Sequence, residues 1–123
     1  MNPETKYVIN TDIKFGALEK IDIGAIEKAC DYNWFNQTLC KVNDSLVRLG
    51  ILKGEFHWHK HADEDEFFYV VAGTLTIDLE GLTVELLPQQ GYTIPKGVVH
   101  RTSAAERAVI LMIEGRDVKP TGD

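Results

Sequence analysis

From Trp34 onward the sequence is divided into short β-prone stretches, and this pattern restricts the chain to a small set of folds. Pairs such as Glu80-Gly81 and Lys96-Gly97 supply turn residues between the stretches. Many strands of about five residues with regular turns are typical of an all-β sandwich or barrel. We therefore expect an all-β fold, with strands over residues 37–42, 46–53, 54–61, 66–72, 75–79, 83–87, 92–94, 98–102 and 108–114.

The amino-terminal part of the chain is less regular. A loose end is expected to precede a short strand over residues 7–10. Between Phe15 and Ala29 the apolar residues follow no single period, and Gly24 interrupts them. This pattern predicts one short helix over residues 24–30.

Composition indicates a single domain without a nucleic-acid partner. The chain has 123 residues, which is enough to form a core without disulfides. The net charge of -6 argues against binding to phosphate backbones, because Lys and Arg drive that binding. No apolar run approaches the roughly 18 residues of a membrane span, and the first six residues lack a signal-peptide core. We expect a cytoplasmic protein with no membrane partner, in which Cys30 and Cys40 are free thiols.

Three of the four histidines, namely His57, His59 and His61, recur at every second residue. On a strand, this spacing places all three side chains on one face. Glu66 follows after a gap long enough to reverse the chain, and His100 lies 34 residues further on. Histidines combined with one carboxylate suit divalent transition ions. The alternative is a solvated hairpin in which histidines lie among acidic residues.

The same stretch resembles the first motif of the cupin superfamily, through His59, His61, Glu66 and Gly73. If His57 and His59 formed the histidine pair instead, Glu64 and Val71 would occupy the acidic and glycine positions, so the first register fits better. His57 is then an additional histidine.

A second cupin motif, Pro-x-Gly-x-x-His, resembles residues 95–100, which end in His100. Two positions depart from the family pattern. The upstream glycine, Gly91, lies only four residues before Pro95, and Ala104 replaces an asparagine that is not a metal ligand. The resemblance covers roughly residues 43–114.

The resemblance implies a double-stranded β-helix, or jelly-roll barrel, with a short amino-terminal helical segment. We expect one cupin domain over residues 1–123. It also implies that His59, His61, Glu66 and His100 bind a divalent transition metal ion, either Fe, Mn, Zn or Ni. Four protein ligands would leave one or two positions open for a small molecule.

His57 and Arg48 are further candidates for the site. We expect His57 to face the lumen and to act as a catalytic acid or base, as a substitute ligand or as a partner of a ligand; otherwise it is a hydrogen-bonded lumen histidine. Arg48 is expected to be exposed, and the alternative is that it faces the lumen and anchors a substrate carboxylate. The acidic residues 63–65 are expected to form a solvated turn.

Apolar residues are also expected on the outside of two strands. Phe56 and Trp58 should point away from the histidines, and Phe67, Tyr69 and Val71 away from Glu66. An outer apolar face must be covered. Either the first forty residues or a second subunit covers it, and the resemblance favours a homodimer.

The leading functional hypothesis is a metal-dependent enzyme that acts on a small organic molecule by oxygenation, isomerisation or lyase chemistry. Small cupins of this kind are similar to metal-binding barrels of the mannose-6-phosphate isomerase-like group. The alternative is a non-catalytic barrel that binds or senses a small ligand. A DNA-binding regulator is disfavoured because the sequence has no helix-turn-helix segment or basic patch.

Overall fold

The computed structural model describes residues 7–123, and the loose end expected before the first strand lies outside them. The all-β prediction is confirmed: strands dominate the described chain, and one short helix accompanies them. Among these residues, no helix has the length and apolar character needed to cross a membrane. The elements are β1 (Val8–Asn10), α1 (Ile23–Ala29), β2 (Trp34–Val42), β3 (Ser45–Glu55), β4 (Glu66–Ala72), β5 (Leu75–Leu79), β6 (Leu82–Leu86), β7 (Gly91–Ile94) and β8 (His100–Gly115).

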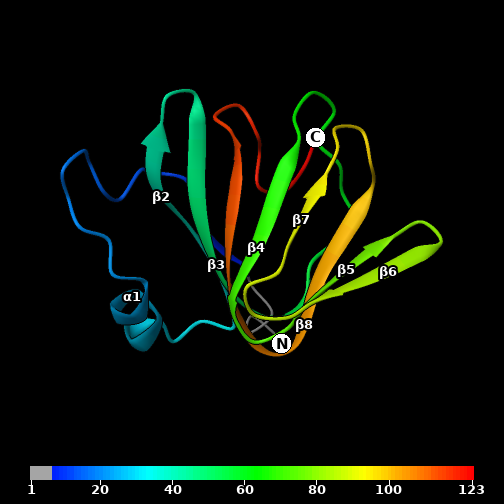
Figure 1. Cartoon of the computed structure of the whole chain (residues 1–123), viewed down its shortest axis with the longest axis horizontal. Helices are drawn as coiled ribbons and strands as arrows, with labels where there is room; N and C mark the ends of the chain where they lie inside the picture. The colour runs from blue at the N-terminus through cyan, green and yellow to red at the C-terminus, as the bar shows by residue number, and fades with distance from the viewer. Residues whose placement is uncertain (1–6) are drawn as a thin grey trace.

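Strand β8 organises the sheet because it pairs with three other strands. Its first residues lie antiparallel to β5, and its second half lies between β3 and β4. The order is β1-β2-β3-β8-β4-β7, and β6 joins through β5. Figure 1 shows these strands around a common interior, with the β5–β6 hairpin diverging on one side.

The two strands predicted at residues 98–102 and 108–114 form the single strand β8. The separate strands were wrong because residues 103–107 contain no glycine or proline that would turn the chain. Across this stretch Ala104 remains paired with Gly54 of β3. The register between β3 and β8 shifts between Leu52 and Gly54, so a bulge, rather than a turn, bends the ladder here.

The interior is filled by side chains that alternate along the strands. On β8, Ala108 and Ile110 are fully buried. They pack in one cluster with aromatic and aliphatic residues from the other strands. These apolar side chains fill one end of the interior, and polar side chains lie at the other end. The buried members of this cluster are Trp34, Leu52, Phe56, Phe68, Val70, Leu75, Ile77, Leu86, Ile94, Ala104, Ala108, Ile110 and Met112.

The amino-terminal segment covers part of the outer face of the sheet. Helix α1 begins after Asp22, whose carboxylate accepts a hydrogen bond from the amide of Ala25 at 3.1 Å and caps the helix. The helix predicted at residues 24–30 is confirmed with a shift of one residue. Ile23 and Ile26 pack against a second buried cluster, formed by Cys30, Leu39, Leu49, Ile51 and Val109.

Gly73 allows β4 to turn tightly into β5. Its φ is +80°, and a β-carbon there would lie 2.6 Å from the carbonyl oxygen of Arg107 and 2.9 Å from the α-carbon of Ala108. Both contacts are with backbone atoms, which cannot move aside easily. The position therefore requires glycine for its conformation and for the close approach of β8.

Candidate metal centre

His59 and His100 lie opposite each other in an isolated antiparallel bridge. The amide of each residue donates a hydrogen bond to the carbonyl of the other, with both N···O distances at 2.9 Å. Their ring centroids are 4.4 Å apart. The bridge thus places histidines from the two sequence motifs side by side.

His61 and Glu66 lie beside this pair. Glu66 is the first residue of β4, and His61 lies in the preceding loop. The amide of Gly97 donates to the carbonyl of His61 at 2.8 Å, and the amide of Lys96 donates to the carboxylate of Asp65 at 2.9 Å. These bonds hold the turn before His100 against the loop that carries His61.

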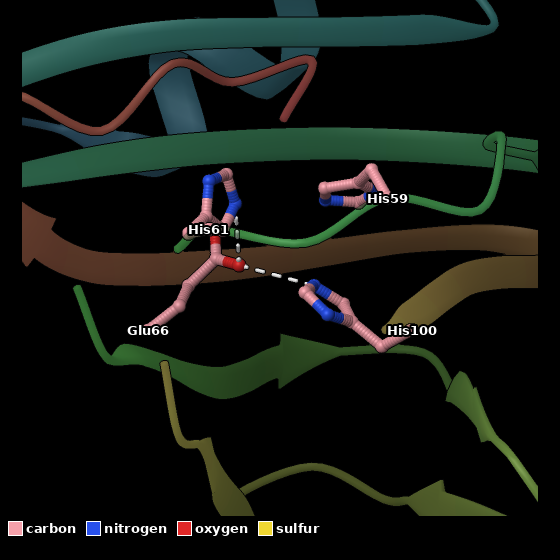
Figure 2. Close-up of side chains that lie close together, drawn as sticks. All are labelled: His59, His61, Glu66 and His100. Carbon is pink, nitrogen blue, oxygen red and sulfur yellow. Dashed lines mark ion pairs between the residues drawn. The ribbon is translucent and has the colours of Figure 1, made fainter. Parts of the chain in front are cut away.

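The four residues predicted as ligands converge in the interior, as Figure 2 shows. Each offers one ligand atom, and these atoms all lie within 4.8 Å of one another. Nε2 of His61 and Nε2 of His100 are each 3.3 Å from Oε1 of Glu66. His61, Glu66 and His100 are buried, and His59 is half-buried. The group could therefore hold a metal ion.

Backbone carbonyls orient two of the imidazoles. Nδ1 of His59 lies 3.0 Å from the carbonyl oxygen of His57, and Nδ1 of His100 lies 3.0 Å from that of Val98. Because a carbonyl can only accept, each Nδ1 carries the proton in these bonds. In the neutral ring, Nε2 then presents a lone pair, which is the arrangement that metal-binding histidines adopt.

Burial and neighbouring groups set the charges of the site. Burial lowers the pKa of His59 to about 4, so its ring is neutral at pH 7. Burial alone would raise the pKa of Glu66, but the adjacent His100 and His61 outweigh that effect and lower it to about 2. A neutral imidazole and an ionised carboxylate are the forms that bind metals.

His57 does not join this group. Its side chain is exposed, and Nε2 lies 2.8 Å from the carbonyl oxygen of Thr121. The expectation that His57 faces the lumen was wrong, because β3 ends at Glu55 and the alternation changes phase after Phe56, so that His57 and His59 do not share a face. A catalytic role for His57 stays a prediction.

The break in alternation also explains the positions of two aromatic residues. Phe56 continues the inward phase of Leu52 and is buried in the interior core, so its expected outward position was wrong. Trp58 is exposed as expected. The guanidinium carbon of Arg101 lies over its ring, 5.0 Å from the ring centroid of Trp58. The phase changes between Phe56 and His59, and this change turns His59 inward.

Arg48 faces the interior and is 2 % exposed, so its expected exposure was wrong. Its Nε donates to Oε1 of Glu114 at 2.6 Å, and Nη2 donates to the carbonyl of Val118 at 3.2 Å. Nη1 donates to the hydroxyl of Thr38. All three guanidinium nitrogens are therefore engaged by the protein.

Glu114 was not identified from the sequence. It lies on β8 directly opposite Glu66 on β4. Burial raises the pKa of Glu114 to about 9, the charge of Glu66 adds to this effect, and Arg48 opposes it only in part. The available signal was its phase, because Ala108, Ile110 and Met112 face inward on the same strand and Glu114 follows their alternation.

A small cavity of about 30 Å³ is lined by two of the four candidate ligands, His59 and Glu66. His59, Glu66 and Glu114 lie on its polar side, together with Asn36, and the remaining wall is mostly apolar. Asn36 was also missed by the sequence analysis, although it follows the inward phase of Trp34 on β2. The apolar lining residues are Trp34, Leu52, Phe56, Phe68, Ile110, Met112 and Pro120.

Residues 118–123, here called the carboxyl-terminal strap, lie along residues 56–61, here called the histidine segment. Pro120 lines the cavity, and a β-carbon on Gly122 would lie 2.5 Å from the β-carbon of His59. The amide of Asp123 donates to the carbonyl of Lys60 at 2.9 Å, and the carboxylate of Asp123 accepts from the amide of Ala62 at 2.6 Å. The strap thus covers one side of the candidate metal centre.

Comparison with known proteins agrees with these features. A family model described as the cupin domain matches residues 48–114. The protein named uncharacterized protein YdbB, from Bacillus subtilis (strain 168), is 41% identical over 85 residues, which are 68% of this chain and 75% of YdbB. Polyketide synthase CurC from Streptomyces cyaneus is 46% identical over 43 residues, which are 35% of this chain and 28% of CurC.

A solved structure shows the same architecture. The crystal structure of a cupin-2 domain containing protein from Shewanella frigidimarina NCIMB 400 superposes with a TM-score of 0.73 at 36% sequence identity, and the match covers 77% of this chain and 93% of that one. The strands therefore form the double-stranded β-helix predicted from the two motifs. From the family match over more than half of its length, together with these relatives, the chain belongs to the cupin family.

Proposed function

We propose that this cupin is a metal-dependent enzyme that acts on a small organic molecule, with His59, His61, Glu66 and His100 as the metal ligands. The convergence of four ligand atoms within 4.8 Å of one another carries this proposal. Nε2 of His61, Nε2 of His100 and Oε1 of Glu66 are buried and have no hydrogen-bond partner. Buried polar atoms in native proteins are normally satisfied, and one metal ion would satisfy all three.

The orientation of His100 strengthens the case for a cation. When its Nδ1–H donates to Val98, the lone pair of Nε2 faces Oε1 of Glu66 at 3.3 Å. Two acceptors at this distance repel each other unless a positive charge lies between them. A proton on Nε2 of His100 would remove the repulsion in the His100–Glu66 pair alone. A metal ion would remove it for all four candidate ligands.

A divalent ion bound here would act as a Lewis acid toward an oxygen-bearing ligand or, if it is iron, bind dioxygen. The chain's own residues would orient the ligand and exclude water, because the aromatic and aliphatic wall of the cavity lies beside the four ligands. Fe, Mn, Zn and Ni all accept a mixed imidazole and carboxylate set. The reaction would be oxygenation, isomerisation or a lyase step.

Elemental analysis of the untagged protein beside a His100→Ala variant tests this proposal. About one metal ion per chain in the wild type, lost in the variant, is the expected result. Iron or manganese would direct the search to oxygen consumption, and zinc or nickel to isomerase and lyase substrates. Equal metal content in both proteins, or no metal in either folded protein, would contradict the ligand assignment.

The second candidate is a non-catalytic barrel that binds or senses a small ligand. The small volume of the cavity, about 30 Å³, does not separate the two candidates, because neither a substrate nor a stored ligand can enter without movement of the wall. Ligand retention without turnover by the metal-loaded protein would support this candidate. The match to CurC adds polyketide-derived compounds to the screen, and membership of the mannose-6-phosphate isomerase-like group stays a prediction.

We further propose that the protein is a cytoplasmic homodimer. Both cysteines are free, as the cytoplasm would keep them. Phe67 of β4 lies opposite Ile113 of β8 on the outer face, where Ile113 and Val71 are each about two-fifths exposed. The amino-terminal segment packs elsewhere on this face, so a second copy would cover the remainder. Light scattering of the wild type and an Ile113→Asp variant should show a dimer and a monomer respectively.

A further inference from the structure

We propose that the ligand of this barrel carries a hydroxyl or amino group that donates a hydrogen bond to the free side-chain oxygen of Glu114. The ligand's far end is therefore a hydrogen-bond donor and not a second acidic group held by Arg48. This inference rests on the proposed function, because it places the other end of the ligand at His59, His61, Glu66 and His100.

Glu114 presents one oxygen to which no described protein group donates a hydrogen bond. Its Oε1 accepts from Nε of Arg48 at 2.6 Å, whereas its Oε2 is buried and accepts from no protein donor. The carboxyl also contacts Glu66, whose ionised side chain can only accept. The side chain is almost fully buried and lines the cavity next to the candidate metal ligands. Oε2 keeps a lone pair in either protonation state of the carboxyl, so it can accept a hydrogen bond from a ligand.

Arg48 cannot serve as an anchor for a ligand carboxylate without losing its present partners. Its three nitrogens donate to Glu114, Thr38 and Val118, and its side chain is 3% exposed. Breaking a buried charge pair of this kind is strongly destabilising. The alternative prediction, in which an inward Arg48 binds a substrate carboxylate, is therefore disfavoured.

The rest of the cavity favours the same class of ligand. Oδ1 of Asn36 is a second buried oxygen without a partner. Glu66 and Glu114 lie opposite each other on neighbouring strands, and Arg48 pairs with only one of them. A carboxylate or phosphate at this end of the cavity would lie near the ionised Glu66, and like charges in a buried site repel strongly. A neutral or cationic donor group meets acceptors instead.

The size of the cavity sets how the ligand enters. About 30 Å³ has room for about two water molecules, so an organic ligand must displace part of the wall. Pro120 of the strap is the lining residue that lies outside the strands and the histidine segment. Movement of the strap would open the cavity without disturbing the barrel.

The test uses two probes with the same three-carbon chain, 3-hydroxypropanoate and malonate. Each has one carboxylate for the metal, and the other end is a hydroxyl group in the first and a second carboxylate in the second. Their affinities for the zinc-loaded full chain are measured by calorimetry, in the wild type and in Glu114→Gln. In that variant Arg48 takes the amide oxygen, so an N–H donor replaces the free acceptor.

The expected result is a change of preference. Because a hydroxyl can accept as well as donate whereas a carboxylate only accepts, Glu114→Gln should strengthen malonate relative to 3-hydroxypropanoate, so that the ratio of their dissociation constants changes by about tenfold or more. Malonate chelates zinc more strongly than the other probe in both proteins. This difference cancels when the ratio in Glu114→Gln is compared with the ratio in the wild type. Glu106→Gln is the matched control, because it removes an exposed carboxylate from the same strand and should leave the ratio unchanged.

A second variant protects the test from misfolding. Arg48→Met combined with Glu114→Leu removes both members of the buried pair, which proteins tolerate better than the loss of one. This double variant should keep its zinc and lose the preference for the hydroxyl probe relative to wild type.

The zinc content distinguishes a failure of this inference from a failure of the proposed metal site. If every protein holds about one zinc ion but the probe ratio is unmoved in Glu114→Gln and in the double variant, this inference is overturned and the proposed metal site stands. Failure of the zinc-loaded wild type to bind either probe also overturns it. If the wild type binds no zinc or other divalent ion, both proposals fail.

Discussion

Nε2 of His100 lies 3.3 Å from Oε1 of Glu66, while Nδ1 of the same ring donates to the carbonyl of Val98. The ring is thus held by the backbone at Nδ1, while Nε2 faces the carboxylate, and the two nitrogens have different environments. The backbone contact orients the imidazole before any ion binds. Such preorganisation lowers the cost of ordering a ligand when the metal enters.

Metal binding should stabilise the folded chain through these residues. At a free zinc concentration of 100 times the dissociation constant, linkage predicts an increase of about 2.7 kcal/mol in the free energy of unfolding. This corresponds to a rise in Tm of about 10 °C for a domain of this size. Differential scanning calorimetry with and without zinc measures it. A shift of the same size in His100→Ala would contradict the assignment.

His57 and His59 should differ in their effect on metal content. His59→Ala removes a member of the converging group and should reduce the metal content to well below one ion per chain. His57→Ala removes an exposed ring that contacts Thr121, so its metal content should match the wild type. Elemental analysis of both variants decides this, and equal losses would place His57 among the ligands.

The strap should slow the removal of metal. Gly122 has a φ of +91°, and a β-carbon there would lie 2.5 Å from that of His59, so Gly122→Ala should displace the strap. We expect at least a severalfold faster transfer of zinc to a colorimetric chelator. Gly81→Ala is the matched control, because its φ is +75° and a β-carbon there meets nothing within 4 Å. Equal rates in the two variants would exclude a covering role for the strap.

The stability of the metal-free protein should fall as the pH rises from about 5 to about 9 because of Glu114. Its folded pKa is raised to about 9, whereas an unfolded glutamate titrates near pH 4.3. Between these values the folded state binds a proton that the unfolded state lacks, so stability falls as the pH rises. Glu114→Gln should remove this slope, which is at most about 1.4 kcal/mol per pH unit for one proton.

Urea unfolding in the presence of a chelator, at pH 5, 7 and 9, measures this slope, with Glu106→Gln as the exposed control. At the acidic end His59 acts in the opposite direction. Its pKa is lowered to about 4, so the unfolded state binds more protons between pH 4 and about 6.5, and stability falls as the pH decreases. A slope that persists in Glu114→Gln would assign the alkaline loss to another group.

Gly73 should be far less replaceable than Gly81. Both have positive φ, at +80° and +75°, so alanine costs about 1–2 kcal/mol in backbone conformation at either site. Only at Gly73 would the new β-carbon collide with backbone atoms of β8, which adds roughly 2 kcal/mol. Urea unfolding of the two alanine variants tests this difference. Equal destabilisation would show that β8 can move away from the turn.

The fold class and four residues of the candidate site could be predicted from the amino-acid sequence alone. Turn residues at regular intervals predicted the strands β4 and β5 to the residue, because local backbone preferences act within a few positions. The spacing of His59, His61 and Glu66, with His100 in a second motif, predicted which side chains meet. Spacing was informative here because it matched two motifs whose order in the cupin barrel brings these candidate ligands together.

Tertiary structure decided the phase of the histidine segment and the partners of the interior polar groups. The chain leaves strand conformation after Glu55 and changes phase after Phe56, so counting by two from His59 and His61 placed Phe56 and His57 on the wrong sides. Arg48 is buried because Glu114, 66 residues later, accepts a hydrogen bond from its guanidinium, and the strap reaches His57 from a distant part of the chain. Such contacts depend on which strands pair across the sheet and on where a bulge shifts the register, and local sequence patterns do not contain that information.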